Sequence, residues 1–217
     1  MAADRIQKIV NAIPVCDTLA DVGCDHGFVG IGALVQGLAK RVRFVDVSAP
    51  SLAKARQNLS DKFADKADFT CRDGLGDIVV DCAVIAGMGG LETISVLEGA
   101  EHLPQNLVLQ PMRNQPDVRR WLIAHGYGIS SDKMFKSAGK YYDLIVAQKG
   151  FVDVDLTETE ILFGKDNIRT KNADFAQYIL HKKNDLKKIL KNTDDQAVAA
   201  RYEQVCAAVE AISEDTK

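Results

Sequence analysis

Several features that define other classes of protein are missing from this chain of 217 residues. No stretch approaches the roughly 18 uninterrupted apolar residues that a membrane-spanning helix needs. The first residues, Met1 to Ile6, lack the basic start and apolar core of a secretory signal peptide. We therefore expect a cytoplasmic protein with no membrane segment.

Paired cysteines are also missing. The five cysteines form no Cys-x-x-Cys pair, and their number is odd. A disulfide framework and a zinc site both need paired spacings, so we expect neither, and we expect no metal. Cys24 would need a neighbouring base to act as a nucleophile, and a small buried side chain is the simpler interpretation. The net charge of −3 supplies no general attraction for nucleic acid, so such a partner needs a local basic patch.

Strand and helix patterns alternate along the first 150 residues. We predict strands at residues 18–22, 42–47, 68–72, 82–85, 107–110, 128–134 and 143–147. We predict helices at residues 4–12, 28–37, 51–62, 91–99 and 115–125. This spacing is typical of βαβ units and of a mostly parallel sheet that is covered on both faces. Only residues 135–142 separate the last two strands, too few for a crossover helix, so these strands should pair antiparallel. The predicted class is α/β: a Rossmann-like, seven-stranded, mostly parallel sheet with a terminal antiparallel hairpin.

The pattern becomes purely helical after residue 150. Residues 172–191 place apolar side chains near one helical face, and from Val198 the apolar positions are spaced 4-3-4-3, as in a heptad seam. We predict two domains: residues 1–150 as the α/β domain, and residues 151–217 as a coiled-coil-like helical hairpin. The hairpin could pack on the core, dimerise or bind RNA, which leaves both a monomer and a weak dimer open.

The turn DVGCDHG, residues 21–27, follows the first predicted strand. It is not the G-x-G-x-x-G fingerprint of dinucleotide sites, and its acids disfavour a phosphate ligand. An acid followed by a glycine suits S-adenosylmethionine, which has a free amino-acid end and a sulfonium but no phosphate. Asp21 would pair with the ammonium group, and Gly23 would let the backbone approach closely. A strand-to-helix turn with incidental acids is the alternative.

Acidic residues also end the second and third predicted strands. Asp46, followed by Val47, would accept hydrogen bonds from ribose hydroxyls. Asp73 and Gly74 would face the adenine amino group of an adenosyl cofactor. A helix cap at Asp46 and a simple Asp-Gly turn at residue 73 are the alternatives. The pattern suits NAD as well as S-adenosylmethionine, but the missing fingerprint glycine makes a nicotinamide oxidoreductase the weakest reading.

The loop AGMGG, residues 86–90, follows the fourth strand. Its three glycines indicate close backbone approach or positive φ. Such a loop lies at the carboxyl ends of parallel strands, where open α/β sheets bind ligands. Ala86, Gly87, Met88 and Gly89 would therefore flank the sulfonium and the incoming nucleophile.

Polar and basic side chains follow the fifth strand. Gln110 and Asn114 could hydrogen-bond a base edge, although Asn114 is also a good helix N-cap. Arg113, Arg119 and Arg120 could meet phosphate groups.

The segments LADVGCDHGFVGI, IAGMGG, LVLQPM, WLIAHGY and KYYDLIVAQKG together resemble the bacterial TrmK-type tRNA methyltransferases, from Arg5 to about Ile212. That family methylates N1 of the adenine at tRNA position 22 with S-adenosylmethionine, so the resemblance implies this cofactor and a tRNA partner. It places Cys24, Asp25 and His26 in the cofactor motif, with Cys24 among the cofactor-binding residues and Asp25 or His26 able to orient the base. Family members often carry a small residue such as Ser in place of Cys24, and Glu in place of Asp46. Met112 stands where they often have Asn, and its presence removes an amide near the expected base pocket.

A basic segment accounts for the expected RNA contacts. Residues 165–191 hold eight basic and three acidic residues, a net charge of +5. The candidates for phosphate contact are Arg113, Lys165, Arg169, Lys171, Lys182, Lys183 and Lys187. A solvated helix face is the alternative. Two other functions stay open: a methyltransferase acting on a small molecule or protein, and a non-catalytic module that binds cofactor or RNA.

Overall fold

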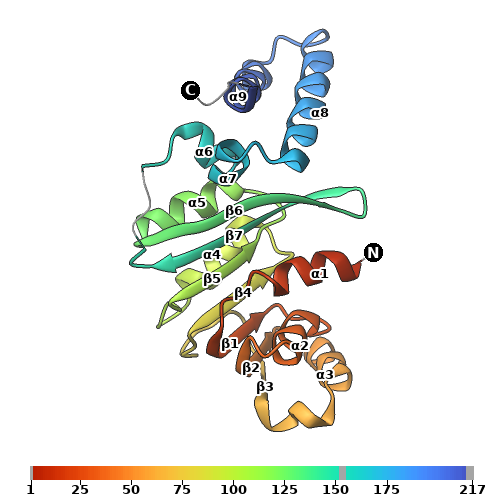
Figure 1. Ribbon diagram of the computed structural model, residues 1–217, viewed down its shortest axis with the longest axis vertical. Helices are drawn as coiled ribbons and strands as arrows, with labels where there is room; N and C mark the ends of the chain where they lie inside the picture. The colour runs from red at the N-terminus through yellow and green to blue at the C-terminus, as the bar shows by residue number, and fades with distance from the viewer. Residues whose placement is uncertain (1, 152–154, 214–217) are drawn as a thin grey trace.

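One seven-stranded sheet organises the protein (Figure 1). The computed structural model describes residues 2–151 and 155–213. The strands are β1 (Cys16–Val22), β2 (Ala39–Asp46), β3 (Ala67–Cys71), β4 (Cys82–Ala86), β5 (Asn106–Gln110), β6 (Tyr127–Ser137) and β7 (Lys140–Lys149). Their order is β3-β2-β1-β4-β5-β7-β6. The first five are parallel, and β7 runs antiparallel to both β5 and β6. The predicted fold class is confirmed.

Helices cover both faces of the sheet (Figure 1). One face packs against α1 (Ala2–Val10), α2 (Phe28–Val35) and α3 (Ala49–Asn58), and the other against α4 (Gly90–Glu98) and α5 (Gln115–Ala124). The helix predicted at 51–62 is displaced toward the N-terminus. Ser48 caps it, accepting a hydrogen bond from the Ser51 backbone N–H at 3.3 Å, and a proline occupies its first turn. A separate 3₁₀ helix, η1 (Asp61–Lys66), follows it.

The β6–β7 hairpin is longer than predicted. Residues 135–142 were expected to be a connection, but most of them extend the two strands. The connection is the pair Ala138 and Gly139, with φ of 49° and 76°. Two successive positive φ values are the geometry of the type I′ turn, whose twist matches that of paired strands. The prediction of a long connection was therefore wrong. Alanine is uncommon at a positive φ, so the sequence gave little indication of a two-residue turn at this position.

The C-terminal segment contains four helices over its described residues. The two predicted helices are α8 (Ala173–Leu190) and α9 (Gln196–Ser213), which share an apolar core. Two short helices that were not predicted precede them: α6 (Glu158–Phe163) and α7 (Lys165–Arg169). Thr157 and Glu160 form a capping box at the start of α6, which fixes the entry of the chain into this unit.

The C-terminal helices attach to the sheet through its edge strand, β6. Three backbone N–H groups of β6 donate to side chains from α7 and α8: Asp132 to Asp166 at 2.9 Å, Met134 to Asn167 at 2.7 Å, and Lys136 to Asp174 at 2.9 Å. These bonds take the place of an eighth strand and cover an edge that would otherwise be free to pair. They hold the helical unit against the sheet.

A buried ion network reinforces this junction. Arg119 of α5 is fully buried, and its guanidinium donates to both carboxylate oxygens of Asp132, at 2.8 and 2.9 Å. It also donates to Asp143 at 2.9 Å and to the Ile161 carbonyl at 3.3 Å. Arg119 therefore binds β6, β7 and α6 together. The expectation that it meets RNA phosphate was wrong, because a side chain committed to buried carboxylates cannot also reach solvent.

Candidate cofactor cleft and catalytic face

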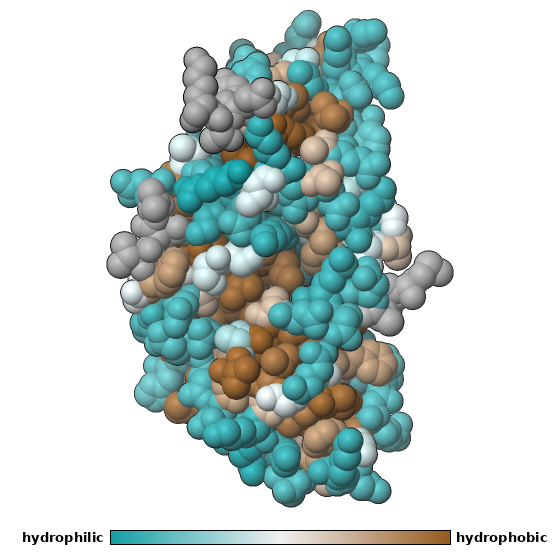
Figure 2. Space-filling model, viewed as in Figure 1, coloured by the Kyte–Doolittle hydropathy of each residue, from teal (hydrophilic) through white to brown (hydrophobic). Residues whose placement is uncertain are grey.

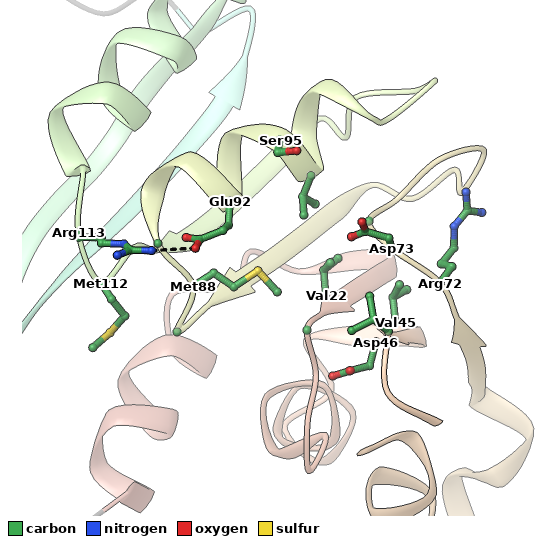
Figure 3. Close-up of a pocket in the computed structure, with 16 residues that line it drawn as sticks. Val22, Val45, Asp46, Arg72, Asp73, Met88, Glu92, Ser95, Met112 and Arg113 are labelled. Carbon is green, nitrogen blue, oxygen red and sulfur yellow. Dashed lines mark hydrogen bonds and ion pairs between the residues drawn. The ribbon is translucent and has the colours of Figure 1, made fainter. Parts of the chain in front are cut away.

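A cleft of about 860 Å³ opens at the carboxyl ends of the parallel strands. Most of the residues predicted to bind cofactor line it: Gly23, Asp46, Val47, Asp73, Gly74, Gly87, Met88 and Gly89. Figure 3 shows Asp46 and Asp73 toward one end, the Glu92–Arg113 ion pair at the other, and the Met88 side chain extending between them. The topology thus brings together loops that are far apart in the chain, from the turn at Gly23 to the loop at Arg113.

Asp46 is held in a fixed orientation at the end of β2. Its Oδ2 accepts the backbone N–H of Asp25 at 3.0 Å, and its Oδ1 accepts that of Ser48 at 2.9 Å. The side chain lies half-buried on the wall of the cleft. Each carboxylate oxygen has a second lone pair, so Asp46 can still accept hydrogen bonds from two hydroxyl groups.

The glycine turn makes a close backbone approach, as predicted. Gly23 has a φ of 66°, and a Cβ atom placed on it would lie 2.1 Å from Cε of Met88. Asp25 adopts a φ of 46°, a conformation that non-glycine residues rarely take unless they are Asn, Asp or His. The thioether of Met88 thus packs directly over the first glycine of the turn.

Asp21 lies beneath this turn, almost fully buried. Its Oδ2 accepts the Gly30 backbone N–H at 2.8 Å, so it satisfies a donor in the first turn of α2. Burial raises the pKa of Asp21 to about 7, and the nearby Asp46 carboxylate adds to the rise, while the bond from Gly30 opposes it. A carboxyl group with this pKa gains from a cationic partner.

A second hollow of about 310 Å³ adjoins the cleft and shares Gly23, Gly87 and Met88 with it. Asp21, Cys24, Asp25, His26 and Ala86, all predicted site residues, line it together with Arg5 and Phe28. The His26 ring stacks on Phe28 with centroids 5.4 Å apart, and its Nε2 lies 3.6 Å from the Asp25 carboxylate.

Arg5 is a candidate functional residue that was not predicted from the sequence. Its one sequence signal is its place one turn before Ile9, on the face that α1 buries. Its Nε donates to Oε1 of Gln110 at 2.8 Å, across 105 residues of sequence.

Cys24 is buried, and burial raises the pKa of its thiol to about 12. The thiol is therefore protonated at neutral pH and is no nucleophile. This agrees with its interpretation as a small apolar residue.

Two candidates for base contact occupy different places from those expected. Gln110 is almost fully buried and is not among the residues lining either hollow; its Nε2 donates to Sδ of Met112 at 3.3 Å. Asn114 occupies the N-cap position of α5 at a φ of 57°, but its side chain makes no capping bond and instead donates to Asp117 at 3.2 Å. The N-cap prediction was therefore right for the position and wrong for the side chain.

The expected RNA contacts divide into inward and outward groups. Lys165 is buried, so its assignment to RNA was wrong. Arg169 pairs with Glu160, Arg113 with Glu92, and Arg120 with Glu158. Lys171 is exposed after α7. Lys182, Lys183 and Lys187 lie on α8, and Figure 2 shows hydrophilic side chains along α8 at the upper right of that view.

Two acids of the basic segment point toward the sheet, whereas the exposed Asp185 lies on α8 and pairs with Lys188. Asp166 and Asp174 are two of the segment's three acidic residues, and both accept hydrogen bonds from the β6 backbone. Because Lys165 is buried and Arg169 is paired, two basic residues are removed together with these two acids, and the rest of the segment keeps a net charge of +5.

The described residues include no helix with the length and apolar character of a membrane span. Nor do they hold a group of three or more His, Cys, Asp or Glu side chains placed to bind a metal ion.

The fold and the acid-lined cleft define a Rossmann-like methyltransferase, and the model of the methyltransferase domain family matches residues 2–145. The chain is 26% identical to the tRNA (adenine(22)-N(1))-methyltransferase of Bacillus subtilis, over 97% of this chain and 94% of that protein. Its structure matches M. capricolum TrmK in complex with S-adenosyl-homocysteine, with a TM-score of 0.87, 22% identity and coverage of 96% and 97%. It matches B. subtilis TrmK with a TM-score of 0.76, 24% identity and 96% coverage of both chains. The chain belongs to the methyltransferase domain family, and over nearly its full length it is similar to a tRNA (adenine(22)-N(1))-methyltransferase.

Proposed function

We propose that this protein is an S-adenosylmethionine-dependent tRNA methyltransferase that methylates N1 of an adenine, at position 22 of its tRNA substrate. The observation that carries the proposal is the Asp46 carboxylate, oriented by two backbone N–H groups on the wall of a cleft that also contains Asp73. The B. subtilis relative, matched over nearly the full length of both chains, supports the tRNA substrate, and we propose that the enzyme acts on it in the cytoplasm.

The residues of the cleft fit the cofactor. Asp46 would bind the ribose hydroxyls, and Asp73, exposed beside Gly74, would receive the adenine amino group. The backbone from Gly87 to Gly89 would line the reacting face. When bound, the cofactor supplies an electrophilic methyl group on a sulfonium.

Methylation at N1 requires little acid–base catalysis by the protein. N1 of a neutral adenine has a lone pair and no proton, so no side chain has to remove a proton first. Positioning the two reactants in line therefore accounts for most of the catalysis expected here. The methylated base carries a positive charge, which the exposed Asp25 carboxylate beside His26 would favour. N1 is hidden in a base pair, so the adenine must be unpaired or flipped out.

Binding of the tRNA body needs phosphate contacts. The partly exposed Lys182 and Lys183 and the exposed Lys187 on α8 would provide them, together with the exposed Lys171. The side-chain bonds to β6 hold α8 against the catalytic domain, so the proposed RNA surface and the cleft keep one relative position.

Mass spectrometry of nucleosides tests the proposal directly. Unmodified tRNA is incubated with S-adenosylmethionine and the protein, and 1-methyladenosine is expected. The matched controls are the Asp46→Asn protein and a tRNA with guanine at position 22, and neither should yield the product. Formation of 1-methyladenosine in the guanine-22 tRNA would contradict the assigned position. If no methylated nucleoside forms, the proposed substrate is wrong, and Met112, which is exposed on the cleft wall, is the first residue to exchange for Asn.

A further inference from the structure

The β6–β7 hairpin projects past the end of its neighbour β5. The last pair between β5 and β7 joins Leu109 to Ile145, so residues 140–144 of β7 continue beyond it. At about 3.3 Å per residue, this part of the hairpin is about 16 Å long. β5 ends at Gln110, at the edge of the sheet where the cleft opens, so the hairpin tip overhangs that edge. Figure 1 shows the tip at the right, between α1 and the first turns of α8.

The tip borders the second hollow, which adjoins the cleft. Tyr142 lies beside Arg5, whose guanidinium is 5.3 Å from the centre of the Tyr142 ring. Arg5 in turn donates to Gln110 at 2.8 Å and lines the hollow. An RNA strand whose base enters the cleft over this edge would therefore pass the tip.

The hairpin turns its acids inward and its lysines outward. Its two acidic residues, Asp132 and Asp143, are buried and bonded to Arg119. Its exposed or partly exposed cations are Lys133, Lys136, Lys140 and Lys149. The surface of the hairpin therefore carries positive charge, although the net charge of the chain is −3.

Two acids lie near the tip on the neighbouring helices. Asp174 of α8 accepts the Lys136 backbone N–H at 2.9 Å, and Asp4 of α1 lies 4.0 Å from Lys8. Each of these acids thus has another partner. Among the described residues, Lys133 and Lys140 have no ion-pair partner and keep their charge available.

Lys133 and Lys140 lie on the same face of the hairpin. Lys140 is paired with Ser137, which follows Lys133 by four residues on β6, and alternate residues of a strand share a face. Four residues of strand span about 13 Å. The two ammonium groups can therefore contact different phosphates of one RNA strand.

The tip is also joined to α8. The Lys136 ammonium and the Tyr141 hydroxyl both donate to Oε1 of Gln177, at 2.8 and 2.7 Å. Lys187 lies ten residues further along the same helix, a distance of about 15 Å. These bonds fix the tip between the proposed RNA surface of α8 and the cleft.

We propose that the hairpin tip is a second RNA contact, in which Lys133 and Lys140 bind phosphate groups of the tRNA strand that leads into the cleft. The inference rests on the proposed function, and it assigns a surface that none of the predicted RNA contacts includes. An ammonium group on a flexible stem suits a backbone phosphate, which carries charge but no sequence information. The tip therefore adds affinity and holds the strand over the cleft without reading its sequence.

Binding of unmodified tRNA at several salt concentrations tests the proposal. In the double variant Lys133→Gln, Lys140→Gln, we expect the affinity for tRNA to fall about 10- to 50-fold at about 0.1 M salt. The slope of log affinity against log salt should become shallower by about 1.5 to 2. The affinity for S-adenosyl-homocysteine should not change, because neither lysine lines the cleft or the second hollow. Both side chains are exposed, so the variant should fold normally.

The matched control is Lys149→Gln. Lys140 is the first residue of β7 and Lys149 the last, so two exposed lysines stand at opposite ends of one strand, about 30 Å apart. Lys140→Gln alone should make the salt slope shallower by about 1, whereas Lys149→Gln should leave it unchanged. Equal losses in these two variants would mean that the overall charge of the protein governs binding, and would overturn the inference. An unchanged slope in the double variant would overturn it as well.

Formation of 1-methyladenosine is measured separately from binding. If the wild-type protein methylates tRNA and the double variant binds tRNA with an unchanged slope, the inference fails and the proposed function stands. If the wild-type protein binds tRNA through the tip but forms no methylated nucleoside, the proposed function fails and the tip stands as an RNA contact.

Discussion

Replacing Asp21 by Asn should stabilise the fold increasingly as the pH rises. The pKa of Asp21 is about 7 in the folded protein and 3.8 as its ordinary value. At pH values between these two pKa values, Asp21 is protonated in the folded state and ionised in the unfolded state. Because the folded state binds the extra proton, the stability of the wild-type protein falls as the pH rises from about 4 to about 7. A difference of about 3 pKa units corresponds to about 4 kcal/mol at 1.36 kcal/mol per unit.

Asn removes this dependence without removing the local hydrogen bond. Its side-chain oxygen can still accept the Gly30 N–H, which Asp21 accepts at 2.8 Å. Its NH₂ group adds a buried donor, which can cost about 1–3 kcal/mol at every pH. The diagnostic quantity is therefore the change of the stability difference with pH, and not its value at one pH.

Urea denaturation of both proteins at pH 4 and pH 8 measures that change. We expect the Asn variant to gain about 4 kcal/mol relative to wild type between the two pH values, or about 8–16 °C in Tm. The same variant should bind S-adenosyl-homocysteine far more weakly, because the ammonium group loses its partner. Asp25→Asn, an exposed change in the same turn, is the control and should shift stability by no more than about 0.5 kcal/mol. A stability difference that stays constant with pH would refute the assignment of a desolvated, proton-binding Asp21.

Two further variants test the junction and the RNA surface. Arg119→Met should lower the free energy of unfolding by about 3–5 kcal/mol, because it leaves buried carboxylates unpaired, whereas Arg120→Met on the exposed side of α5 should cost at most about 1 kcal/mol. Equal losses in urea denaturation would contradict the buried network. Changing Lys182, Lys183 and Lys187 together to Gln should raise the KM for tRNA and reduce the slope of log affinity against log salt by about 2–3. The affinity of this triple variant for S-adenosyl-homocysteine should not change. If the slope of log affinity for tRNA against log salt is unaltered, α8 is not part of the RNA interface.

Many residues of the cofactor cleft can be predicted from the sequence, because their positions depend on local patterns. Asp21, Asp46 and Asp73 each lie at or just beyond the end of a strand, and the carboxyl ends of parallel strands meet at one edge of a sheet. The alternation of strands and helices therefore places these acids together before any contact is known. The glycines are readable for the same reason, since positive φ and close approach are properties of a few neighbouring residues.

The sequence by itself thus determined the alternation of strands and helices, the acidic turns and the family resemblance. Tertiary structure alone decided which charges face solvent: Lys165 and Arg119 look like surface cations in the sequence, yet both are buried. It also decided that Arg5 meets Gln110, 105 residues away, beside the second hollow. Burial and pairing of a charge depend on partners brought from distant segments, and periodicity reports only the face of one element.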